Sequence, residues 1–254
     1  MERWAGRVAV VTGASSGIGA AITKDLVRKG LIVVGLDKME IKIQELDEAP
    51  GRLHAIQCDV SEEEEILASF KWIKENLGHV DVLVNNAGVF YESMLSNGNT
   101  AEWRKQIDVN ILGLAICTRE MLKGRGDRDG HIIHINSVAG HYPPLFKGGG
   151  IYNATKHAVT SLTENLRKEL VELKSKVKVT SVSPGLVKTG LIRRGNIHNI
   201  TADKVFETYP YLEPEDISDA VLYVLGTPPR VQFYENFSNN SSDCQTFSNK
   251  TTQQ

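Results

Sequence analysis

Residues 12–19 have the sequence Thr12-Gly13-Ala14-Ser15-Ser16-Gly17-Ile18-Gly19, and they join a short apolar run to a segment with helical periodicity. The apolar run covers Arg7 to Val11, a length that fits a buried strand. A strand, a glycine-rich turn and a helix in this order can build a pyrophosphate site, because glycines let the backbone approach the phosphates and the helix N-terminus offers unpaired N–H groups. The spacing Gly-x-x-x-Gly-x-Gly differs from the commoner Gly-x-Gly-x-x-Gly, so a purely structural turn is the alternative.

A second apolar run, from Leu31 to Leu36, ends at Asp37, eighteen residues after Gly19. In dinucleotide-binding folds an acidic residue about 20 residues after the glycine turn binds the ribose hydroxyls of the adenosine half. The same carboxylate repels a 2′-phosphate, whereas the neighbouring Lys38 attracts one. We therefore expect NAD(H) as the cofactor, with NADP(H) as the close alternative. A solvated carboxylate at a strand end is the structural alternative for Asp37.

Short apolar runs alternate with helical patterns through the rest of the chain. Further strands are expected at Leu53–Gln57, Val80–Val84, His131–Ile135 and Val177–Val182. Helices are expected at Ile41–Glu48, after Ser61 with Glu64 as its capping-box partner, at Trp103–Leu122, from Ile151 to Leu173 and from Pro214 onward. This alternation predicts an α/β fold with a doubly wound parallel sheet, a Rossmann fold, in a single domain.

The C-terminal part of the chain has few apolar residues. The only candidate for a closing strand is Val231–Tyr234, and the residues from Asn236 onward are mostly Asn, Ser, Thr and Gln. Such a composition cannot bury enough apolar surface to order itself. We therefore expect a folded domain over residues 1–235 and a disordered polar tail over residues 236–254. The weakly patterned segment 190–211 is expected to be a mobile lid over the substrate.

Small and polar residues follow most of the expected strands. Because ligands bind at the carboxyl ends of the strands in open α/β sheets, we expect these residues to line one cofactor cleft. Asp59 is placed to contact adenine, although an Asp after a strand is also ordinary turn chemistry. The expected cofactor contacts are Gly13, Ser15, Ser16, Gly17, Ile18, Gly19, Asp37, Lys38, Asp59, Val60, Asn86, Ala87, Gly88, Tyr152, Lys156, Pro184, Gly185, Val187 and Thr189.

A phenol and an ammonium stand four residues apart at the start of a long helical pattern, in Tyr152-Asn153-Ala154-Thr155-Lys156. This spacing puts Tyr152 and Lys156 on one face of the helix. An ammonium within a few ångströms favours the phenolate, so we expect it to lower the pKa of Tyr152 toward the working pH. The pair is a candidate acid/base group, and a surface pair at chance spacing is the alternative.

Two further polar residues are expected near this pair. Ser137 follows the fifth strand, at the ligand-binding edge of the sheet and fifteen residues before Tyr152. Asn110 lies in the middle of a helical pattern, where its amide competes for backbone groups, and we expect it to hold a water near the cleft. His141 is expected to be a loop residue, because no acidic residue precedes it at a spacing that would orient a catalytic histidine.

The charge and the cysteines exclude several other classes of protein. Lys and Arg total 29 against 31 Asp and Glu, a net charge of −2, so neither nucleic acid nor an anionic membrane is an expected partner. Cys58, Cys117 and Cys244 are scattered without metal-ligand spacing, so we expect reduced thiols and no metal site. No apolar run approaches the roughly 20 residues that span a membrane. We expect a cytoplasmic protein that acts on a small molecule.

Taken in chain order, these motifs resemble the short-chain dehydrogenase/reductase family from residue 5 to about residue 230. The resemblance is carried by Thr12-Gly13-x-x-x-Gly17-Ile18-Gly19, Asn85-Asn86-Ala87-Gly88, Asn110, Ser137, Tyr152-x-x-x-Lys156 and Pro184-Gly185. Met1-Glu2-Arg3-Trp4, Ile116–Glu120 and Gly130–Ser137 are more narrowly similar to the cytosolic carbonyl and ketosteroid reductases and the insect farnesol dehydrogenases of that family.

The resemblance implies an oxidoreductase and a role for each residue. Tyr152 would be the acid/base, and Lys156 would lower its pKa and hold the nicotinamide ribose. Ser137 would bind the substrate oxygen, Asn110 the water of a proton relay, and Thr189 the carboxamide. A hydride would pass between the nicotinamide and an alcohol or carbonyl substrate, such as farnesol, another lipophilic alcohol or a ketosteroid. A homodimer or homotetramer is also implied.

A non-catalytic dinucleotide-binding protein, such as a redox sensor, is the alternative from another functional class. It would need the glycine turn and Asp37 but neither Tyr152 nor Lys156. The presence of both favours the enzyme.

Overall fold

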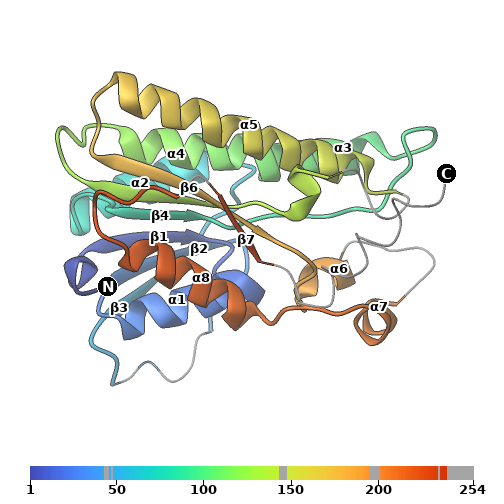
Figure 1. Cartoon of the computed structure of the whole chain (residues 1–254), viewed down its shortest axis with the longest axis horizontal. Coiled ribbons are helices and arrows are strands. Elements are labelled where there is room, and N and C mark those ends of the chain that lie inside the picture. The colour runs from blue at the N-terminus through green and yellow to red at the C-terminus, as the bar shows by residue number, and fades with distance from the viewer. Residues whose placement is uncertain (43–45, 47, 143–147, 195–200, 234, 239–254) are drawn as a thin grey trace.

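The computed structural model describes residues 1–42, 46, 48–142, 148–194, 201–233 and 235–238. Its centre is a seven-stranded sheet in the order β3-β2-β1-β4-β5-β6-β7, and all neighbouring strands are parallel (Figure 1). The strands are β1 (Val8–Thr12), β2 (Ile32–Asp37), β3 (Arg52–Gln57), β4 (Val82–Asn85), β5 (Gly130–Ile135), β6 (Val177–Pro184) and β7 (Glu235–Ser238). This order confirms the doubly wound parallel sheet expected from the sequence.

Helices cover both faces of the sheet. The helices α1 and α8 lie on one face, and α2, α4 and α5 lie on the other (Figure 1). Their buried side chains form a hydrophobic cluster on each face. The α-helices are α1 (Gly17–Arg28), α2 (Glu63–Asn76), α3 (Thr100–Ile107), α4 (Leu114–Leu122), α5 (Gly150–Glu172), α6 (Gly190–Arg194), α7 (Ala202–Thr208) and α8 (Pro214–Gly226). Two short 3-10 helices, η1 (Glu2–Trp4) and η3 (Val138–Gly140), and a π-helix, η2 (Asp108–Gly113), complete the described elements.

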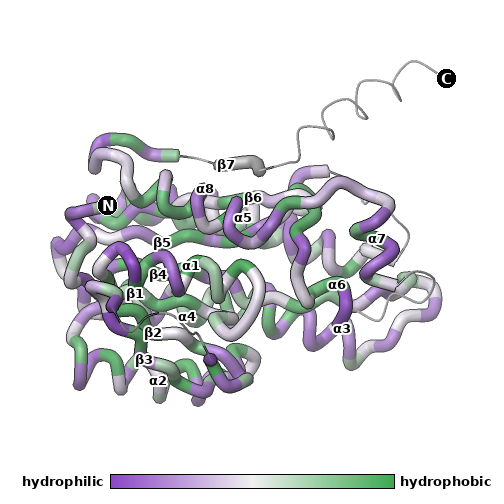
Figure 2. Tube along the Cα trace, turned by 90° about the horizontal axis from the view of Figure 1, so that it is seen from below, coloured by the Kyte–Doolittle hydropathy of each residue, from purple (hydrophilic) through white to green (hydrophobic). Residues whose placement is uncertain are grey.

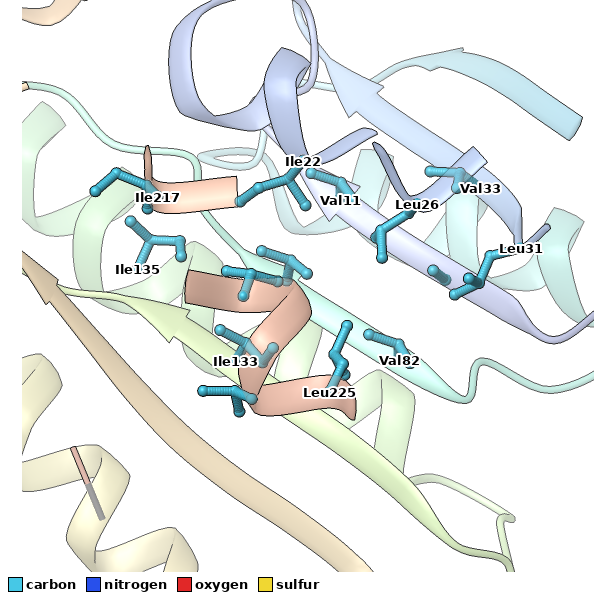
Figure 3. Packing of buried hydrophobic residues seen from close by; sticks show 14 of the residues in the cluster. Val11, Ile22, Leu26, Leu31, Val33, Val82, Ile133, Ile135, Ile217 and Leu225 are labelled. Carbon is cyan, nitrogen blue, oxygen red and sulfur yellow. The ribbon is translucent and has the colours of Figure 1, made fainter. Parts of the chain in front are cut away.

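The packing of β1 explains why β1 and its neighbours β2 and β4 appear in the sequence as apolar runs. Val8 and Val10 pack with the α2, α4 and α5 layer, whereas Ala9 and Val11 pack with the α1 and α8 layer. Figure 3 shows Val11 among the side chains of the α1 and α8 layer, which include Ile22 and Ile217. Successive side chains of a strand point to opposite faces, so a strand covered on both sides must be apolar at every position. Each fully buried aliphatic side chain stabilises the fold by about 1.5–3 kcal/mol. Figure 2 shows the inner strands as hydrophobic and much of the outer surface as hydrophilic.

Two histidines interrupt the apolar character of β5. His131 Nε2 lies 2.9 Å from Thr180 Oγ1, and His134 Nδ1 lies 2.9 Å from Thr163 Oγ1. Both rings are buried, and burial lowers the pKa of each to about 3. They are therefore neutral at neutral pH, held by hydroxyl partners on β6 and α5.

Two local expectations around α2 are wrong. The helix begins at Glu63 with Glu62 as its N-cap and without a side-chain capping bond. Ser61, the expected cap, instead donates its hydroxyl to Asp59 Oδ1 at 2.7 Å, so its oxygen is turned away from the helix. A helix was also expected at 41–48, but its described residues 41, 42, 46 and 48 are not helical, and its other positions lie outside the described residues.

The closing strand also differs from expectation. It begins at Glu235 and pairs with β6 through Asn236, Phe237 and Ser238, whereas Val231–Tyr234 was expected to form it. The expected disordered tail is therefore wrong for residues 236–238, because an edge strand gains its backbone hydrogen bonds from one neighbour and needs no apolar run. Residues 239–254 lie outside the described residues.

The expected helix at Trp103–Leu122 is present but not continuous. It divides into α3, the π-helix η2 and α4, and Asn110 lies within the π-helical part. The expected helix from Pro214 is confirmed, with Pro214 at its first position. In the part of the chain that the structure describes, no helix has both the length and the apolar composition needed to cross a membrane.

Candidate active site

The glycine-rich turn between β1 and α1 has a backbone that only glycine fits. Gly13 has a φ of +69° and Gly17 a φ of +55°, in the left-handed region that other residues disfavour. A Cβ on Gly13 would lie 2.9 Å from Asn86 Nδ2, and one on Gly19 would lie 2.1 Å from the Gly13 carbonyl oxygen. The N-cap of α1, Ser16, makes no side-chain capping hydrogen bond. The turn and the open helix N-terminus therefore fit the pyrophosphate of a dinucleotide.

Asn86 and Thr12 tie the end of β4 to the end of β1. Asn86 Nδ2 donates to the carbonyl oxygens of Thr12 at 2.9 Å and Gly13 at 3.2 Å. The hydroxyl oxygen of Thr12 accepts the backbone N–H groups of Asn86 and Ala87, each at 3.0 Å. Asn86 thus joins two neighbouring strand ends. This contact holds the loop of Ala87 beside the glycine turn.

Asp37 stands at the end of β2, against the same turn. Its Oδ2 accepts the backbone N–H of Ser15 at 3.0 Å, and its Oδ1 accepts that of Met39 at 2.9 Å. Two backbone donors thus fix the carboxylate at the position where folds of this type bind the adenosine ribose. The neighbouring Lys38 accepts a hydrogen bond from Gln57 Nε2 through its carbonyl oxygen, at 3.3 Å.

Asp59 follows β3 and is held by a cation that the sequence did not indicate. Lys105 Nζ, on α3, lies 3.2 Å from Asp59 Oδ2 and 2.6 Å from Ser61 Oγ. Burial raises the pKa of Asp59, but hydrogen bonds from Ser61 and the ion pair with Lys105 hold it below its usual value. Since 46 residues separate Lys105 from Asp59 along the chain, local sequence pattern carries no signal for this pair.

Lys156 is buried on α5 with its ammonium group at the carboxyl end of β5. Nζ donates to the carbonyl oxygen of Ile135 at 2.9 Å and lies 5.8 Å from the centre of the Tyr152 ring. Burial lowers the pKa of Lys156 to about 8. At neutral pH the ammonium is therefore mostly charged and fixed beside the phenol, which confirms that the spacing of these residues brings them together.

Tyr152 packs edge-on against Phe90, with the ring centres 5.2 Å apart. Burial raises the pKa of Tyr152 to about 12, and a hydrogen bond with Ser137 opposes that rise. The expected lowering of this pKa by Lys156 is thus wrong for these side chains by themselves. The reason is that burial penalises the phenolate, while the ammonium is bound to a backbone carbonyl and faces the ring.

Ser137 begins the short helix η3 directly after β5. Its Oγ accepts the backbone N–H of Ala139 at 3.1 Å, so the hydroxyl proton is free to be donated elsewhere. The hydrogen bond with Tyr152 shows that the serine and the phenol meet at one place. The carboxyl end of β5 therefore presents Ser137, Tyr152 and Lys156 together, as acid/base chemistry on a substrate oxygen requires.

Asn110 connects the π-helix η2 to the start of α5. Its Oδ1 accepts the N–H of Val89 at 2.9 Å, and its Nδ2 donates to the Val89 carbonyl at 2.9 Å and to Thr155 Oγ1 at 3.1 Å. Thr155 Oγ1 in turn donates to the carbonyl of Tyr152 at 2.7 Å. Both amide hydrogens of Asn110 are therefore used within the protein. A π-helix inside an α-helix often marks a functional site, and neither it nor Thr155 was expected from the sequence.

The segment after β6 closes the other side of the glycine turn. Val187 pairs with Leu212, and the backbone of Lys188 donates to the Leu212 carbonyl at 2.8 Å. Thr189 follows, and its Cγ2 lies 3.0 Å from the point where a Cβ on Gly17 would stand. Pro184 and Gly185 come directly before this segment, at the end of β6. Of the expected cofactor residues in and after β6, Thr189 is thus placed against Gly17, at the start of α1.

The remaining titratable candidates lie apart from this chemistry. His141 Nε2 lies 3.2 Å from Ser183 Oγ, which agrees with a loop residue held by the sheet. Cys58 and Cys117 are buried and not in disulfides, and Cys244 lies outside the described residues. Among the described side chains, no group of three or more His, Cys, Asp or Glu is arranged to hold a metal ion.

Known proteins share both the sequence and the site-bearing fold. Residues 7–199 match the model of the short chain dehydrogenase family. The farnesol dehydrogenase of Aedes aegypti is 49% identical over 243 residues, which cover 92% of this chain and 96% of the relative. The dehydrogenase/reductase SDR family member 11 of Gallus gallus is 47% identical over 244 residues, which cover 91% of this chain and 95% of the relative.

Solved structures agree with this match. The closed form of serine dehydrogenase complexed with NADP+ superposes with a TM-score of 0.81 at 33% identity, covering 91% of this chain and 93% of that one. An actinorhodin polyketide ketoreductase with NADPH gives a TM-score of 0.82 at 29% identity, covering 91% and 95%. The glycine turn, the serine-tyrosine-lysine group and these matches lead to one conclusion: the chain belongs to the short-chain dehydrogenase family, and it is a nicotinamide-dependent oxidoreductase of alcohols or carbonyl compounds.

Proposed function

We propose that the substrate of this oxidoreductase is a long apolar alcohol such as farnesol, with the matching carbonyl compound in the reverse direction. The observation that carries the proposal is the apolar surroundings of Tyr152. Phe90 packs on its ring, and a Cβ on Gly150, two residues before it, would lie 3.6 Å from Leu95 Cγ. Leu95 and Met94 are 68% and 47% exposed. Exposed apolar side chains in the segment that contacts the start of the acid/base helix fit an apolar substrate, and the Aedes relative carries farnesol in its name.

The test is a comparison of alcohols that differ in apolar length. Turnover with propanol, geraniol and farnesol, followed as absorbance at the nicotinamide band, should show kcat/KM rising with chain length. Leu95→Asp should remove most of that rise while leaving propanol unaffected. Equal kcat/KM for all three alcohols would contradict an apolar substrate. Binding of NADH without turnover of any alcohol, aldehyde or ketone would instead indicate a non-catalytic dinucleotide-binding protein.

The positions of the residues support a role for each of them. When bound, the nicotinamide accepts a hydride from the alcohol carbon or supplies one to the carbonyl carbon. Ser137 donates a hydrogen bond to the substrate oxygen, because its own oxygen is already used by Ala139. Tyr152 removes the alcohol proton as a phenolate, or gives a proton to the carbonyl oxygen as a phenol. Lys156, charged and fixed by Ile135, stabilises that phenolate and holds the nicotinamide ribose.

Asn110 would contribute to the proton relay through its backbone. Its side-chain amide hydrogens are bound to Val89 and Thr155, so they are not available to a water. A relay water would therefore lie on the main-chain carbonyl of Asn110. The Asn110 side chain then positions this part of η2 relative to Tyr152, through Thr155.

NAD(H) is the proposed cofactor. The carboxylate of Asp37, fixed by Ser15 and Met39, would accept both ribose hydroxyls and repel a 2′-phosphate. The two solved structures described above hold NADP+ and NADPH, so NADP(H) is the competing choice. The ratio of kcat/KM values with NAD+ and NADP+ decides between them.

The remaining proposals concern the molecule as a whole. Ile107 on α3, Leu112 on η2 and Val171 on α5 are exposed, at 40%, 50% and 72%, which supports a homodimer or homotetramer that buries these helices. Light scattering on Leu112→Glu should show a smaller particle than the wild type. The unpaired thiols of Cys58 and Cys117 support a cytoplasmic location, which imaging of a tagged chain in its own cells would test.

A further inference from the structure

Arg194, at the end of α6, reaches across to the glycine turn. Its Nη2 donates to Ser16 Oγ at 3.2 Å, although 178 residues separate the two positions in the chain. The same Nη2 would lie 3.2 Å from a Cβ on Gly190, so the guanidinium folds back over the start of α6. The side chain therefore points from the segment after β6 toward the N-terminus of α1.

This position is electrostatically unfavourable for the protein by itself. Ser16 is the N-cap of α1, and the helix dipole places partial positive charge at that end. Arg194 forms no ion pair with a carboxylate among the described residues, whereas the adjacent Arg193 pairs with Asp203 at 2.6 Å. A cation held at the positive end of a helix without an acidic partner is explained if an anion lies between them.

We propose that Arg194 binds the pyrophosphate of the dinucleotide from the side opposite the glycine turn. Backbone N–H groups of residues 16–19 would hold the phosphate oxygens from one side, and the guanidinium, whose fork of N–H groups matches phosphate, from the other. Thr189 already brings the same segment against Gly17. The attraction between the pyrophosphate and Arg194 would then hold α6 over the site. This inference rests on the dinucleotide site of the proposed function.

The test compares Arg194→Gln with Arg193→Gln, a neighbour of the same type that pairs with Asp203 away from the turn. Titration of the intrinsic fluorescence of NADH should give a Kd that rises about 10- to 100-fold for Arg194→Gln and changes less than about twofold for Arg193→Gln. Arg194→Lys should recover part of the affinity. Thermal melting of each variant checks that the fold is intact.

Competition with fragments of the cofactor assigns the contact. ADP-ribose, which has the pyrophosphate but no nicotinamide, should lose affinity for Arg194→Gln as much as NADH does, whereas adenosine should lose none. The salt dependence of the Kd should also be weaker for this variant. An unchanged Kd, or a loss for NADH without one for ADP-ribose, would overturn the role of Arg194 alone. Absence of NADH and NADPH binding by the wild type would overturn the dinucleotide site itself, and with it this inference.

Discussion

The carboxylate of Asp37 accepts the backbone N–H of Ser15 at 3.0 Å, which joins the end of β2 to the glycine turn. The negative charge is thereby held where the adenosine ribose would lie, and it cannot swing away without leaving the Ser15 N–H unpaired. Charge-assisted hydrogen bonds of this kind contribute about 1.5–3 kcal/mol each. We therefore propose that the choice between NAD(H) and NADP(H) depends on Asp37, a side chain whose position the turn itself fixes.

The first prediction concerns that choice. Wild-type kcat/KM should be higher with NAD+ than with NADP+, because Lys38 can return only about 1 kcal/mol through an exposed pair with the 2′-phosphate. Asp37→Ala should reverse the preference, and Asp37→Asn, which keeps an acceptor for Ser15 but not the charge, should reduce it. Lys38→Ala in the Asp37→Ala background should then lower the use of NADP+. A wild type that prefers NADP+ would show that Asp37 does not bind the hydroxyls of the adenosine ribose.

The second prediction concerns the acid/base group. Tyr152→Phe removes the only hydroxyl of that ring, and turnover should fall by at least about 10²-fold while the Kd of NADH stays within a few-fold of the wild type. Ser137→Ala should also lower turnover, since it removes the donor to the substrate oxygen. Single-turnover kinetics together with NADH titration separate the two effects. Near-normal turnover of Tyr152→Phe would assign the proton transfer to another group.

The third prediction is that Lys156 lowers the stability of the fold. Its pKa is about 8 in the folded chain against an ordinary value of 10.5. Above pH 10.5 the lysine is neutral in both the folded and the unfolded chain, and its burial does not lower the free energy of unfolding. That part of the stability is lost as the pH falls through 8, because the unfolded chain then binds a proton more readily than the folded chain. At 1.36 kcal/mol per pKa unit, the loss in the free energy of unfolding is on the order of 3 kcal/mol.

Lys156→Met should therefore raise the free energy of unfolding at pH 7, and the gain should shrink by pH 10. The same variant should bind NADH more weakly, because the ribose loses its partner. Urea unfolding at the two pH values and NADH titration measure these effects. Lys156→Arg, which keeps a buried cation, serves as the control and should show no gain. A less stable Lys156→Met at pH 7 would mean that the bond to Ile135 outweighs the cost of burying the charge.

The fourth prediction concerns acid sensitivity through His134. Its folded pKa of about 3 lies below the ordinary value of 6.5, so the unfolded chain binds a proton that the folded chain does not. Stability present above pH 6.5 is lost as the pH falls toward 3, with a slope of up to about 1.4 kcal/mol per pH unit. In His134→Gln, the slope of the free energy of unfolding against pH should be smaller by about that amount between pH 6 and pH 4. Urea unfolding at each pH measures this slope.

The fifth prediction concerns the last strand. A chain ending at residue 234 lacks β7, so β6 becomes the edge of the sheet and loses the pairing that Ser181 to Pro184 make with it. Its midpoint of thermal unfolding should fall by several degrees. A chain ending at residue 238 keeps the strand and should match the full chain in midpoint and activity. Equal midpoints for both shortened chains would show that β7 contributes nothing to stability.

The parts of the fold that follow from local physics could be predicted from the sequence. Buried strands are apolar on both faces, so β1, β2 and β4 appear as apolar runs. The glycine turn is visible because Gly13 and Gly17 adopt a backbone that other residues avoid. Tyr152 and Lys156 meet because helical spacing brings residues four apart onto one face.

Other parts depend on contacts that no local pattern shows. β7 is polar, and it forms because β6 offers an open edge. The π-helix is hidden because the buried positions Gln106, Val109, Asn110 and Gly113 keep an ordinary helical spacing. The ion pair between Lys105 and Asp59 joins separate elements. The pKa of Tyr152 depends on how deeply the folded chain buries it, and for that reason the direction expected from Lys156 alone was wrong.

The order of the strands also determines how the chain can fold while it is being made. β1 is made well before β4, yet it lies inside the sheet and pairs with β4, where Ala9 is aligned with Val82. At a synthesis rate of about 5–20 residues per second, one edge of this apolar strand stays unpaired for roughly 4 to 15 s until β4 has been made. During synthesis, β1, the strand that carries the cofactor turn, thus has one open apolar edge. Prompt growth of the chain to β4 protects that edge from pairing with another molecule.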